Sequence, residues 1–204
     1  MSSRPRTNMS SPALARAVEL VVHRGPHRVL DGVSETLCQG EVVAVMGENG
    51  SGKTTLIEAF AGLLPLRSGD VIWEEYGNSI VVRDSKGRRN QPPPMGLTLQ
   101  KGGVCGEETI IERISVSLSV AGIEHSDGQI MELLSHWGLE HRANDSLAHL
   151  SGGLRRRVAI LGGLAPAALS NSPLVVLLDE PSEGLDDSAK DILRSWIRTL
   201  SSRN

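Results

Sequence analysis

The glycine-rich segment at residues 47–54 constrains the fold of this chain more than any other feature. It reads Gly-Glu-Asn-Gly-Ser-Gly-Lys-Thr, which fits the pattern G-x-x-x-x-G-K-[ST]. Residues 41–46 before it, which are apolar after Glu41, predict a short buried strand, and residues 55–60 after it predict the first turns of a helix. A strand, a glycine turn and a helix in this order form the context in which such a loop wraps around a phosphate group.

The residue types in this segment match the chemistry of phosphate binding. Glycines allow several backbone N–H groups to converge on one anion, and the helix N-terminus adds partial positive charge. Lys53 is expected to reach the outer phosphates, and the Thr54 hydroxyl is expected to ligate Mg²⁺. The alternative is a glycine-rich turn with an incidental lysine. The predicted nucleotide-binding residues are Gly47, Glu48, Asn49, Gly50, Ser51, Gly52, Lys53, Thr54 and Thr55.

Composition narrows the class of protein. The 204 residues suit one large domain, and the net charge of −3 carries no nucleic-acid or polybasic membrane signature. We therefore expect no nucleic-acid partner. Cys38 and Cys105 lie far apart without a CxxC motif, which is typical of reduced thiols in an intracellular protein. No apolar run approaches the roughly 20 residues of a membrane helix, no signal peptide is visible, and residues 1–12 read as a disordered tail.

Strand and helix signals alternate along the first half of the chain. Residues 18–22 predict an edge strand, and residues 71–73 and 79–82 predict two more strands. The helix after the glycine loop is expected to bury one face. Residues 84–94 form a charged loop that ends in prolines, and its cations are expected to be solvated. The expected helix face comprises Leu56, Ile57, Phe60 and Leu64, and the loop cations are Lys86, Arg88 and Arg89.

The middle third becomes helical before an α/β pattern resumes. Apolar residues at helical spacing predict helices over 110–121 and 130–137, which read as an insert between two halves of the core. The continuous apolar run 174–178 predicts a strand covered on both faces, as in a parallel sheet. A terminal amphipathic helix follows over 192–200, with Asp187 or Ser188 as its N-cap. The fold class is therefore α/β.

Two acids follow the apolar strand 174–178. Asp179 is expected near Mg²⁺, directly or through water, and Glu180 is expected to polarise the attacking water in nucleotide hydrolysis. The alternative is a strand that ends in solvated acids.

Further motifs between and after these segments carry a family resemblance. Residues 150–154 read Leu-Ser-Gly-Gly-Leu, which resembles the LSGGQ signature of ATP-binding cassette (ABC) ATPases with Leu154 in place of the glutamine. Residues 182–186 are similar to that family's D-loop, and Gln100 stands where its Q-loop glutamine belongs. Residues 30–34 and 40–41 resemble the usual lead-in to the phosphate loop. The motifs occur in the family's order, and the resemblance covers about residues 14–200.

The resemblance implies a fold and a division of the chain. The fold is a P-loop NTPase (RecA-like) core with flanking helices, an N-terminal antiparallel β subdomain and an inserted helical subdomain. A single ABC ATPase domain is expected over 13–204, with a catalytic core at 13–103 and 163–204 and a helical subdomain at 104–162.

The resemblance also implies roles for single residues. Glu180 and Gln100 are the expected catalytic residues, and Thr54, Gln100 and Asp179 are the expected metal ligands. The signature faces the γ-phosphate of ATP bound to an opposite subunit, and the expected nucleotide contacts there are Ser151, Gly152, Gly153 and Asp186. Arg155, Arg156 and Arg157 are interpreted as a solvated helix face. Leu154 is expected to tune the activity.

The implied function is that of an ATP-binding and ATP-hydrolysing subunit of an ABC transporter, with ATP and Mg²⁺ as cofactors. ATP binding would close a homodimer or a pair with a related ATPase subunit, and hydrolysis would reopen it. Residues 106–150 would dock on a separate polytopic membrane subunit, with Gln100 and the segment 101–103 as the coupling link. The chain is expected to be cytoplasmic and peripheral at the inner face of the cell membrane.

Two departures from the family pattern qualify these expectations. The family stacks adenine on an aromatic residue before the phosphate loop, whereas no Phe, Tyr or Trp precedes Phe60 here, so His23 or Arg24 would take that place. The family also carries a switch histidine, and none of the six histidines follows Asp186. Either the sequence is truncated after Asn204, which we favour, or the missing strand comes from elsewhere, or the subunit works without that histidine. These residues alone are then expected to hydrolyse ATP slowly.

Three other functions remain open from the sequence. The first is a soluble ABC ATPase without a transporter, such as an iron–sulfur assembly or translation factor, although a translation factor usually carries two cassettes. The second is a coiled-coil DNA-repair ATPase, which the short gap without heptads between Thr54 and Leu150 disfavours. The third is a nucleotide sensor that does not hydrolyse ATP.

Overall fold

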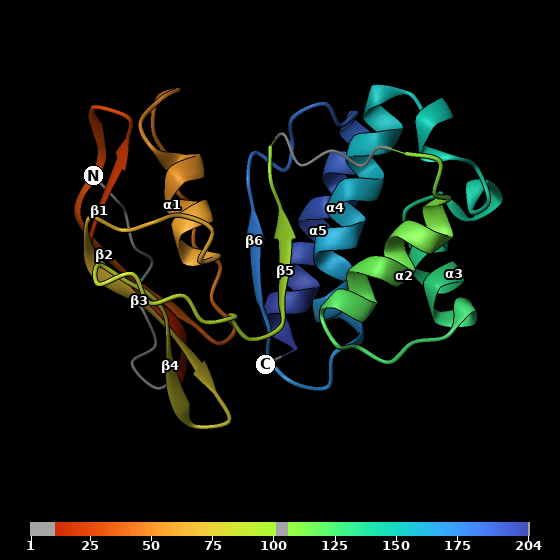
Figure 1. Ribbon diagram of the computed structural model, residues 1–204. Coiled ribbons are helices and arrows are strands. Elements are labelled where there is room, and N and C mark those ends of the chain that lie inside the picture. Colours follow the sequence, from red (N-terminus) through yellow and green to blue (C-terminus); the bar gives the residue numbers. More distant parts are fainter. Residues whose placement is uncertain (1–10, 101–105, 204) are drawn as a thin grey trace. The chain divides into compact units, whose positions relative to one another are not determined.

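The computed structural model describes residues 11–100 and 106–203, whose described parts form two compact units, one ending at residue 93 and the other beginning at residue 94. The predicted tail lies mostly, and the segment 101–103 and Cys105 lie wholly, outside the described residues. The model is drawn in Figure 1. The expected boundary between residues 162 and 163 falls inside a continuous helix, α4 (Gly152–Leu169).

The first unit is built on an antiparallel sheet. Its strands are β1 (Ala13–Arg24), β2 (His27–Cys38), β3 (Ser68–Glu75) and β4 (Asn78–Asp84), in the order β2-β1-β3-β4. This confirms the antiparallel β subdomain. The prediction of an edge strand at 18–22 is wrong, because β1 pairs with β2 on one side and with β3 on the other. The alternating apolar residues of β1 supply its buried side chains, such as Ala15, Ala17 and Leu20.

The helix α1 (Lys53–Phe60) is shorter than the sequence pattern indicates. Gly62 has φ 71° and donates its N–H to Ala59, while the Leu63 N–H reaches back to Glu58, which is a Schellman ending. Leu64 therefore lies outside the helix, and the buried positions are Thr55, Ala59 and Phe60 rather than Leu56 and Ile57. The indole N–H of Trp73 in β3 donates to the Phe60 carbonyl at 3.0 Å and ties α1 to the sheet.

The predicted buried strand at 41–46 is wrong. These residues carry no regular structure, and Val42 and Met46 are exposed. A turn closed by the Glu41 N–H on the Cys38 carbonyl ends β2 just before them. An apolar run forms a strand only where another strand completes its backbone hydrogen bonds, and within the first unit the described strands pair only among themselves.

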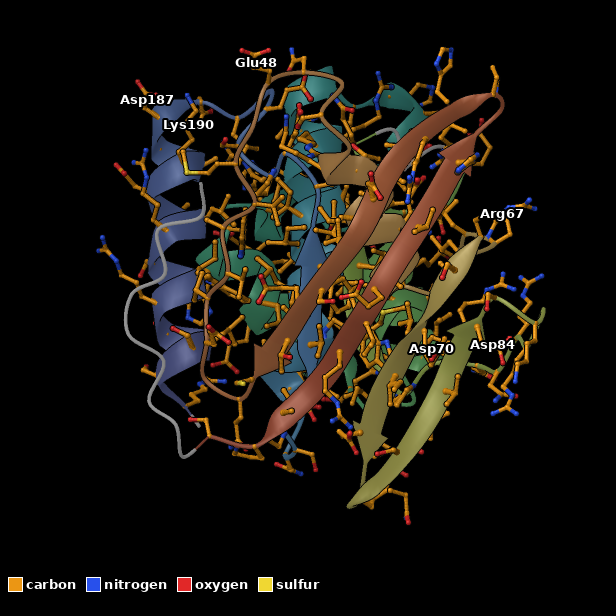
Figure 2. All side chains as sticks on the ribbon, turned by 90° about the vertical axis from the view of Figure 1, so that its left-hand side faces the viewer. Glu48, Arg67, Asp70, Asp84, Asp187 and Lys190 are labelled. Atoms are coloured by element: carbon orange, nitrogen blue, oxygen red, sulfur yellow. The ribbon has the colours of Figure 1, made fainter. Side chains whose placement is uncertain are left out.

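The loop after β4 is confirmed as a solvated charged segment, because Lys86, Arg88 and Arg89 are all exposed. Its start is nonetheless ordered, since Asp84 accepts the backbone N–H groups of Lys86 and Arg88. Figure 2 shows Asp84 and Asp70 on neighbouring strands, where they stand directly opposite each other in the β3–β4 register.

The second unit combines a parallel strand pair with helices. Strands β5 (Met95–Thr98) and β6 (Val175–Leu178) run parallel, as the apolar run at 174–178 predicts. The helices are α2 (Ile110–Val120), α3 (Asp127–His136), α4 and α5 (Asp187–Ser202), with short 3₁₀ turns at Glu140–Arg142 and Leu147–His149. In Figure 1 these helices gather on one side of the strand pair.

One hydrophobic cluster joins the helices of this unit. The predicted faces of α2 and α3 are confirmed, since Ile110, Ile114, Leu118, Ile130 and Leu134 are all 0% exposed within it. The buried face of α5, which includes Ala189 and Leu193, packs on the same cluster. The N-cap of α5 is Asp186, which accepts the Ala189 N–H at 2.8 Å, and not Asp187 or Ser188 as predicted, because the helix begins one residue earlier.

Glycines allow α4 to approach β5 closely. A Cβ on Gly96 would lie 1.9 Å from the Gly163 carbonyl oxygen, and a Cβ on Gly163 would lie 2.1 Å from the Thr98 hydroxyl. The Thr98 hydroxyl in turn donates to the Ala159 carbonyl of α4 at 3.1 Å. These contacts hold the middle of α4 against β5, whose end is followed by the predicted catalytic residues.

Candidate functional site

The phosphate loop in the first unit is shaped for an anion. Gly50 and Gly52 have φ values of 83° and 99°, which only glycine adopts without strain. A side chain at Gly52 would also meet Val29 of β2 at 3.0 Å. The loop therefore requires glycine at the place where the chain turns into α1.

The N-terminus of α1 is open to a ligand. No side chain caps this helix end, and its first turn carries no acidic residue. The first N–H groups of a helix lack internal partners and, with the helix dipole, favour a negatively charged group. Figure 2 shows the Glu48 side chain at the tip of the loop, directed outward from it.

Lys53 adds a positive charge to the loop itself. Its ammonium donates to the carbonyls of Gly47 and Glu48, at 2.9 and 3.0 Å. The flexible lysine is thus held across the loop, where it can exchange weak carbonyl contacts for phosphate oxygens. Thr54 is partly exposed beside it, and Thr55 is 7% exposed and packs inward.

The two candidates for the adenine contact have different surroundings. Arg24, at the end of β1, donates to the Glu58 carboxylate of α1. His23 is exposed beside it. Arg24 is therefore tied to the helix that begins at the phosphate loop, whereas His23 is not restrained by any described hydrogen bond of its side chain.

The second unit brings the predicted catalytic residues together. Because β5 and β6 are parallel, their carboxyl ends meet at one edge, and the Asp179 N–H donates to the Thr98 carbonyl at 2.8 Å. The Gln100 amide donates to the Glu180 carboxylate at 3.0 Å, and the Gln100 backbone N–H lies 3.4 Å from an Asp179 carboxylate oxygen. The structure thus places Gln100, Asp179 and Glu180 in direct contact.

The two acids have distinct environments. Asp179 is 1% exposed, whereas Glu180 is partly exposed and has a positive φ of 46°. A left-handed conformation at a residue other than glycine stores strain and is characteristic of functional sites. The interpretation as a solvated acid is wrong for Asp179, which is buried, whereas Glu180 is partly exposed and accepts a hydrogen bond from Gln100.

Two polar residues near this cluster were not assigned to the site from the sequence. Glu183 accepts a hydrogen bond from the Gln100 amide at 3.3 Å. Arg156 of α4 donates to the carbonyls of Leu99, Asp179 and Glu180. The interpretation of Arg156 and Arg157 as a solvated face is wrong, since Arg157 also donates to the Trp137 carbonyl and to the Asp186 carboxylate.

The signature residues form the start of α4. Ser151 is the N-cap and accepts the Leu154 N–H at 3.3 Å, so its hydroxyl partly satisfies the helix end. Gly152 has open space around it, and a Cβ on Gly153 would lie 3.3 Å from the Gly184 carbonyl. The signature therefore lies beside the residues 182–186. Leu154, the departure from the family pattern, packs against the hydrophobic cluster.

The predicted magnesium ligands are all oxygen donors. The Thr54 hydroxyl, the Gln100 amide oxygen and the Asp179 carboxylate match the oxygen preference of Mg²⁺. The Gln100 amide nitrogen is directed to carboxylates, which leaves its oxygen for a cation. Across the described ranges, no group of three His, Cys, Asp or Glu side chains forms an all-protein metal cluster. The chemistry of each donor fits an ion that is bound largely through its nucleotide and water.

Within residues 11–100 and 106–203, no helix is both long enough and apolar enough to cross a bilayer.

Comparisons with known proteins agree with this geometry. The family model described as ABC transporter matches residues 30–183. The lipoprotein-releasing system ATP-binding protein LolD of Saccharophagus degradans is 34% identical over 184 residues, which cover 88% of this chain and 78% of that protein. The Fe(3+) ions import ATP-binding protein FbpC of Streptomyces coelicolor is 34% identical over 194 residues, which cover 94% of this chain and 52% of that protein.

Solved structures show the same fold. An ATP-binding subunit of an ABC transporter superposes with a TM-score of 0.74 at 26% identity, over 93% of this chain and 75% of that one. The ADP conformation of an ATP-binding cassette superposes with a TM-score of 0.68 at 24% identity, over 95% and 78% of the two chains. The chain therefore belongs to the ABC transporter family, as one of its ATP-binding subunits.

Proposed function

We propose that this chain binds Mg²⁺–ATP and hydrolyses it through the residues that the two units present. The observation that carries the hydrolytic part is the contact of Gln100 with both Asp179 and Glu180 at the ends of β5 and β6. The first unit supplies phosphate binding, through residues 47–55 and the uncapped start of α1.

Each residue takes a role that its environment supports. Lys53 exchanges its loop carbonyls for the β- and γ-phosphates. Glu180, partly exposed and hydrogen-bonded to Gln100, accepts a proton from the attacking water, and Gln100 orients that water and the carboxylate. Thr54, Gln100 and Asp179 would hold Mg²⁺, which neutralises charge on the phosphates when it is bound.

We also propose that the active form is a dimer of ATPase subunits docked on a membrane protein. In the family resemblance, Ser151, Gly152, Gly153 and Asp186 act on ATP held by the opposite subunit. The exposed start of α4 supports this arrangement, since Ser151, Gly152 and Gly153 are open to a partner. A cytoplasmic position at the inner face of the membrane follows from such a complex.

Cargo selection is assigned to the membrane partner. The two curated relatives are named for different cargoes, lipoproteins and Fe(3+) ions, although each is 34% identical to this chain. Because similar ATP-binding proteins serve different cargoes, this difference supports the proposal that the ATPase supplies energy and does not select the transported substrate.

Replacement of Lys53 tests the nucleotide site. Lys53→Ala removes the ammonium that meets the phosphates, and a hydrogen bond to a charged group contributes about 1.5–3 kcal/mol, so ATP affinity should fall about 10- to 100-fold. Lys86→Ala is the matched control, because Lys86 is an exposed lysine in the same unit, outside the site. Equilibrium binding of Mg²⁺–ATP to the two variants and the wild type decides. Equal affinity of all three proteins would overturn the assignment.

A further inference from the structure

Arg156 joins the signature helix to both strands of the catalytic cluster. One terminal nitrogen of its guanidinium donates to the Leu99 carbonyl at 3.1 Å, and the other donates to the carbonyls of Asp179 and Glu180, both at 2.8 Å. All four residues lie within the second unit. The acceptors are backbone atoms just beyond the ends of β5 and β6, where the strand ladder no longer pairs them.

These carbonyls belong to the backbone that presents the catalytic side chains. Leu99 precedes Gln100, and the other two carbonyls belong to the acids themselves. Glu180 has the left-handed backbone conformation, with φ 46°, and such a conformation persists only where the surroundings hold it. The Glu180 carbonyl accepts hydrogen bonds from Arg156 at 2.8 Å and from the Glu183 backbone N–H at 3.0 Å, and both restrain that conformation.

We propose that Arg156 is a positioning residue for hydrolysis, which fixes the backbone of Glu180 and thereby keeps its carboxylate on the Gln100 amide. The inference rests on the proposed ATPase function. Arg156 reaches neither phosphate nor water in this role, because its hydrogen bonds go to main-chain carbonyls. Arg156 thereby couples the start of α4 to the ends of β5 and β6.

The chemistry of arginine suits this role. A planar guanidinium presents several N–H donors in a fixed fork, so it can donate to three carbonyls at the ends of two strands. The ammonium of a lysine is a point charge on a flexible chain and lacks this fixed geometry. The neighbouring Arg157 serves other partners, the Trp137 carbonyl and the Asp186 carboxylate. The restraint on both strand ends is therefore specific to Arg156 among the described arginines.

The test compares Arg156→Ala and Arg156→Lys with the wild type. The single-turnover rate of ATP hydrolysis should fall about 10- to 100-fold in Arg156→Ala, because a small displacement of a catalytic group costs up to about 10²-fold. The Kd for Mg²⁺–ATP should stay within about twofold, since the phosphate loop is unchanged. Arg156→Lys should also be slow, because its charge remains but the fork is lost.

A matched control and a rescue experiment separate positioning from general stability. Arg142→Ala removes another partly buried arginine of the same unit, which is bonded to Asp145 at 2.6 Å, away from the strand ends, and should hydrolyse ATP at the wild-type rate. Guanidinium ion, added below denaturing concentration, should restore part of the rate of Arg156→Ala and leave Arg142→Ala unchanged.

Defined outcomes overturn the proposal. Hydrolysis by Arg156→Ala within about twofold of the wild type would refute it. A parallel loss of rate, ATP affinity and thermal stability would assign Arg156 to folding alone, and if Arg156→Ala does not fold, wild-type turnover by Arg156→Lys would refute positioning by the fork. Failure of the proposed function is distinguishable, because the wild type would then not hydrolyse ATP, or Glu180→Gln would hydrolyse it as the wild type does.

Discussion

Arg24 and His23 occupy the end of β1, but only Arg24 is anchored. Its guanidinium stays on the Glu58 carboxylate of α1, which places one cation beside the helix of the phosphate loop. No aromatic side chain precedes Phe60 in the sequence, so base stacking of the usual kind has no residue to carry it in this segment. Phosphates and Mg²⁺ are then expected to supply most of the affinity.

We therefore expect the protein to discriminate only weakly between purine nucleotides. A stacked base is worth about 1–3 kcal/mol in single-strand nucleic-acid sites, and we expect that contribution to be mostly missing here. ATP and GTP should therefore bind within about tenfold of each other, as measured by competition. A strong preference for ATP that survives both His23→Ala and Arg24→Ala would show that the base contact lies elsewhere.

Single residues also show what a sequence can predict of the site. Motifs that fix residue types at strand ends predict Gln100, Asp179 and Glu180, and the structure brings these three residues together. The role of Arg156 is not predictable in this way, because its partners are backbone carbonyls, which every residue has, so no sequence pattern marks them. An arginine one turn after the signature glycines was the only available signal.

Two helices of the second unit begin with the same device. Thr109 caps α2 and exchanges hydrogen bonds with Glu112, and Ser126 caps α3 and exchanges hydrogen bonds with Gln129. Such capping boxes satisfy backbone N–H groups that a helix start leaves free. One box contains an ionisable residue and the other does not, so the chain provides its own control for the effect of pH.

The box of α2 should lose strength in acid. Hydrogen bonds from the Thr109 backbone N–H and then from its hydroxyl lower the pKa of Glu112 below its ordinary value of 4.5. A lowered pKa in the folded state means that ionised Glu112 stabilises the fold at neutral pH, and that this contribution disappears as the pH falls through the lowered value. Thr109→Ala should cost about 1 kcal/mol at neutral pH.

Thermal unfolding at two pH values measures the effect. Glu112→Ala should lower Tm at a pH of about 7, and should do so less at an acidic pH, because protonation removes the wild-type charge as the pH falls through the lowered pKa. Gln129→Ala in the matching box should lower Tm equally at both pH values. Equal behaviour of the two variants would contradict the role given to the Glu112 charge.

Local sequence patterns predict the helices of this chain better than they predict which strands pair. Periodic apolar residues located α2 and α3, because a helix completes its own hydrogen bonds. The apolar run at 41–46 lacks regular structure, since a strand depends on a neighbour that its own residues do not specify. The early end of α1 followed from Gly62, a signal that the sequence contains and the apolar spacing obscured.

Across the whole molecule, the motifs are divided between the two compact units. The phosphate loop belongs to residues 1–93, and the Gln100 cluster, the signature and residues 182–186 belong to residues 94–203. The parallel strand pair is predictable from the continuous apolar run at 174–178, whereas the antiparallel subdomain is predictable only from the family resemblance. We propose that these motifs together bind ATP, assemble a dimer and hydrolyse the nucleotide.

The most direct measurement of that claim is the behaviour of Glu180→Gln in Mg²⁺–ATP. The amide keeps the size of the carboxylate but cannot take the proton of water, so hydrolysis should fall about 10²–10⁴-fold while ATP affinity is retained. Light scattering on a sizing column should then show an ATP-dependent dimer, which Lys53→Ala introduced into the same protein abolishes. Turnover at the wild-type rate by Glu180→Gln, or a monomer at saturating ATP, would contradict the account.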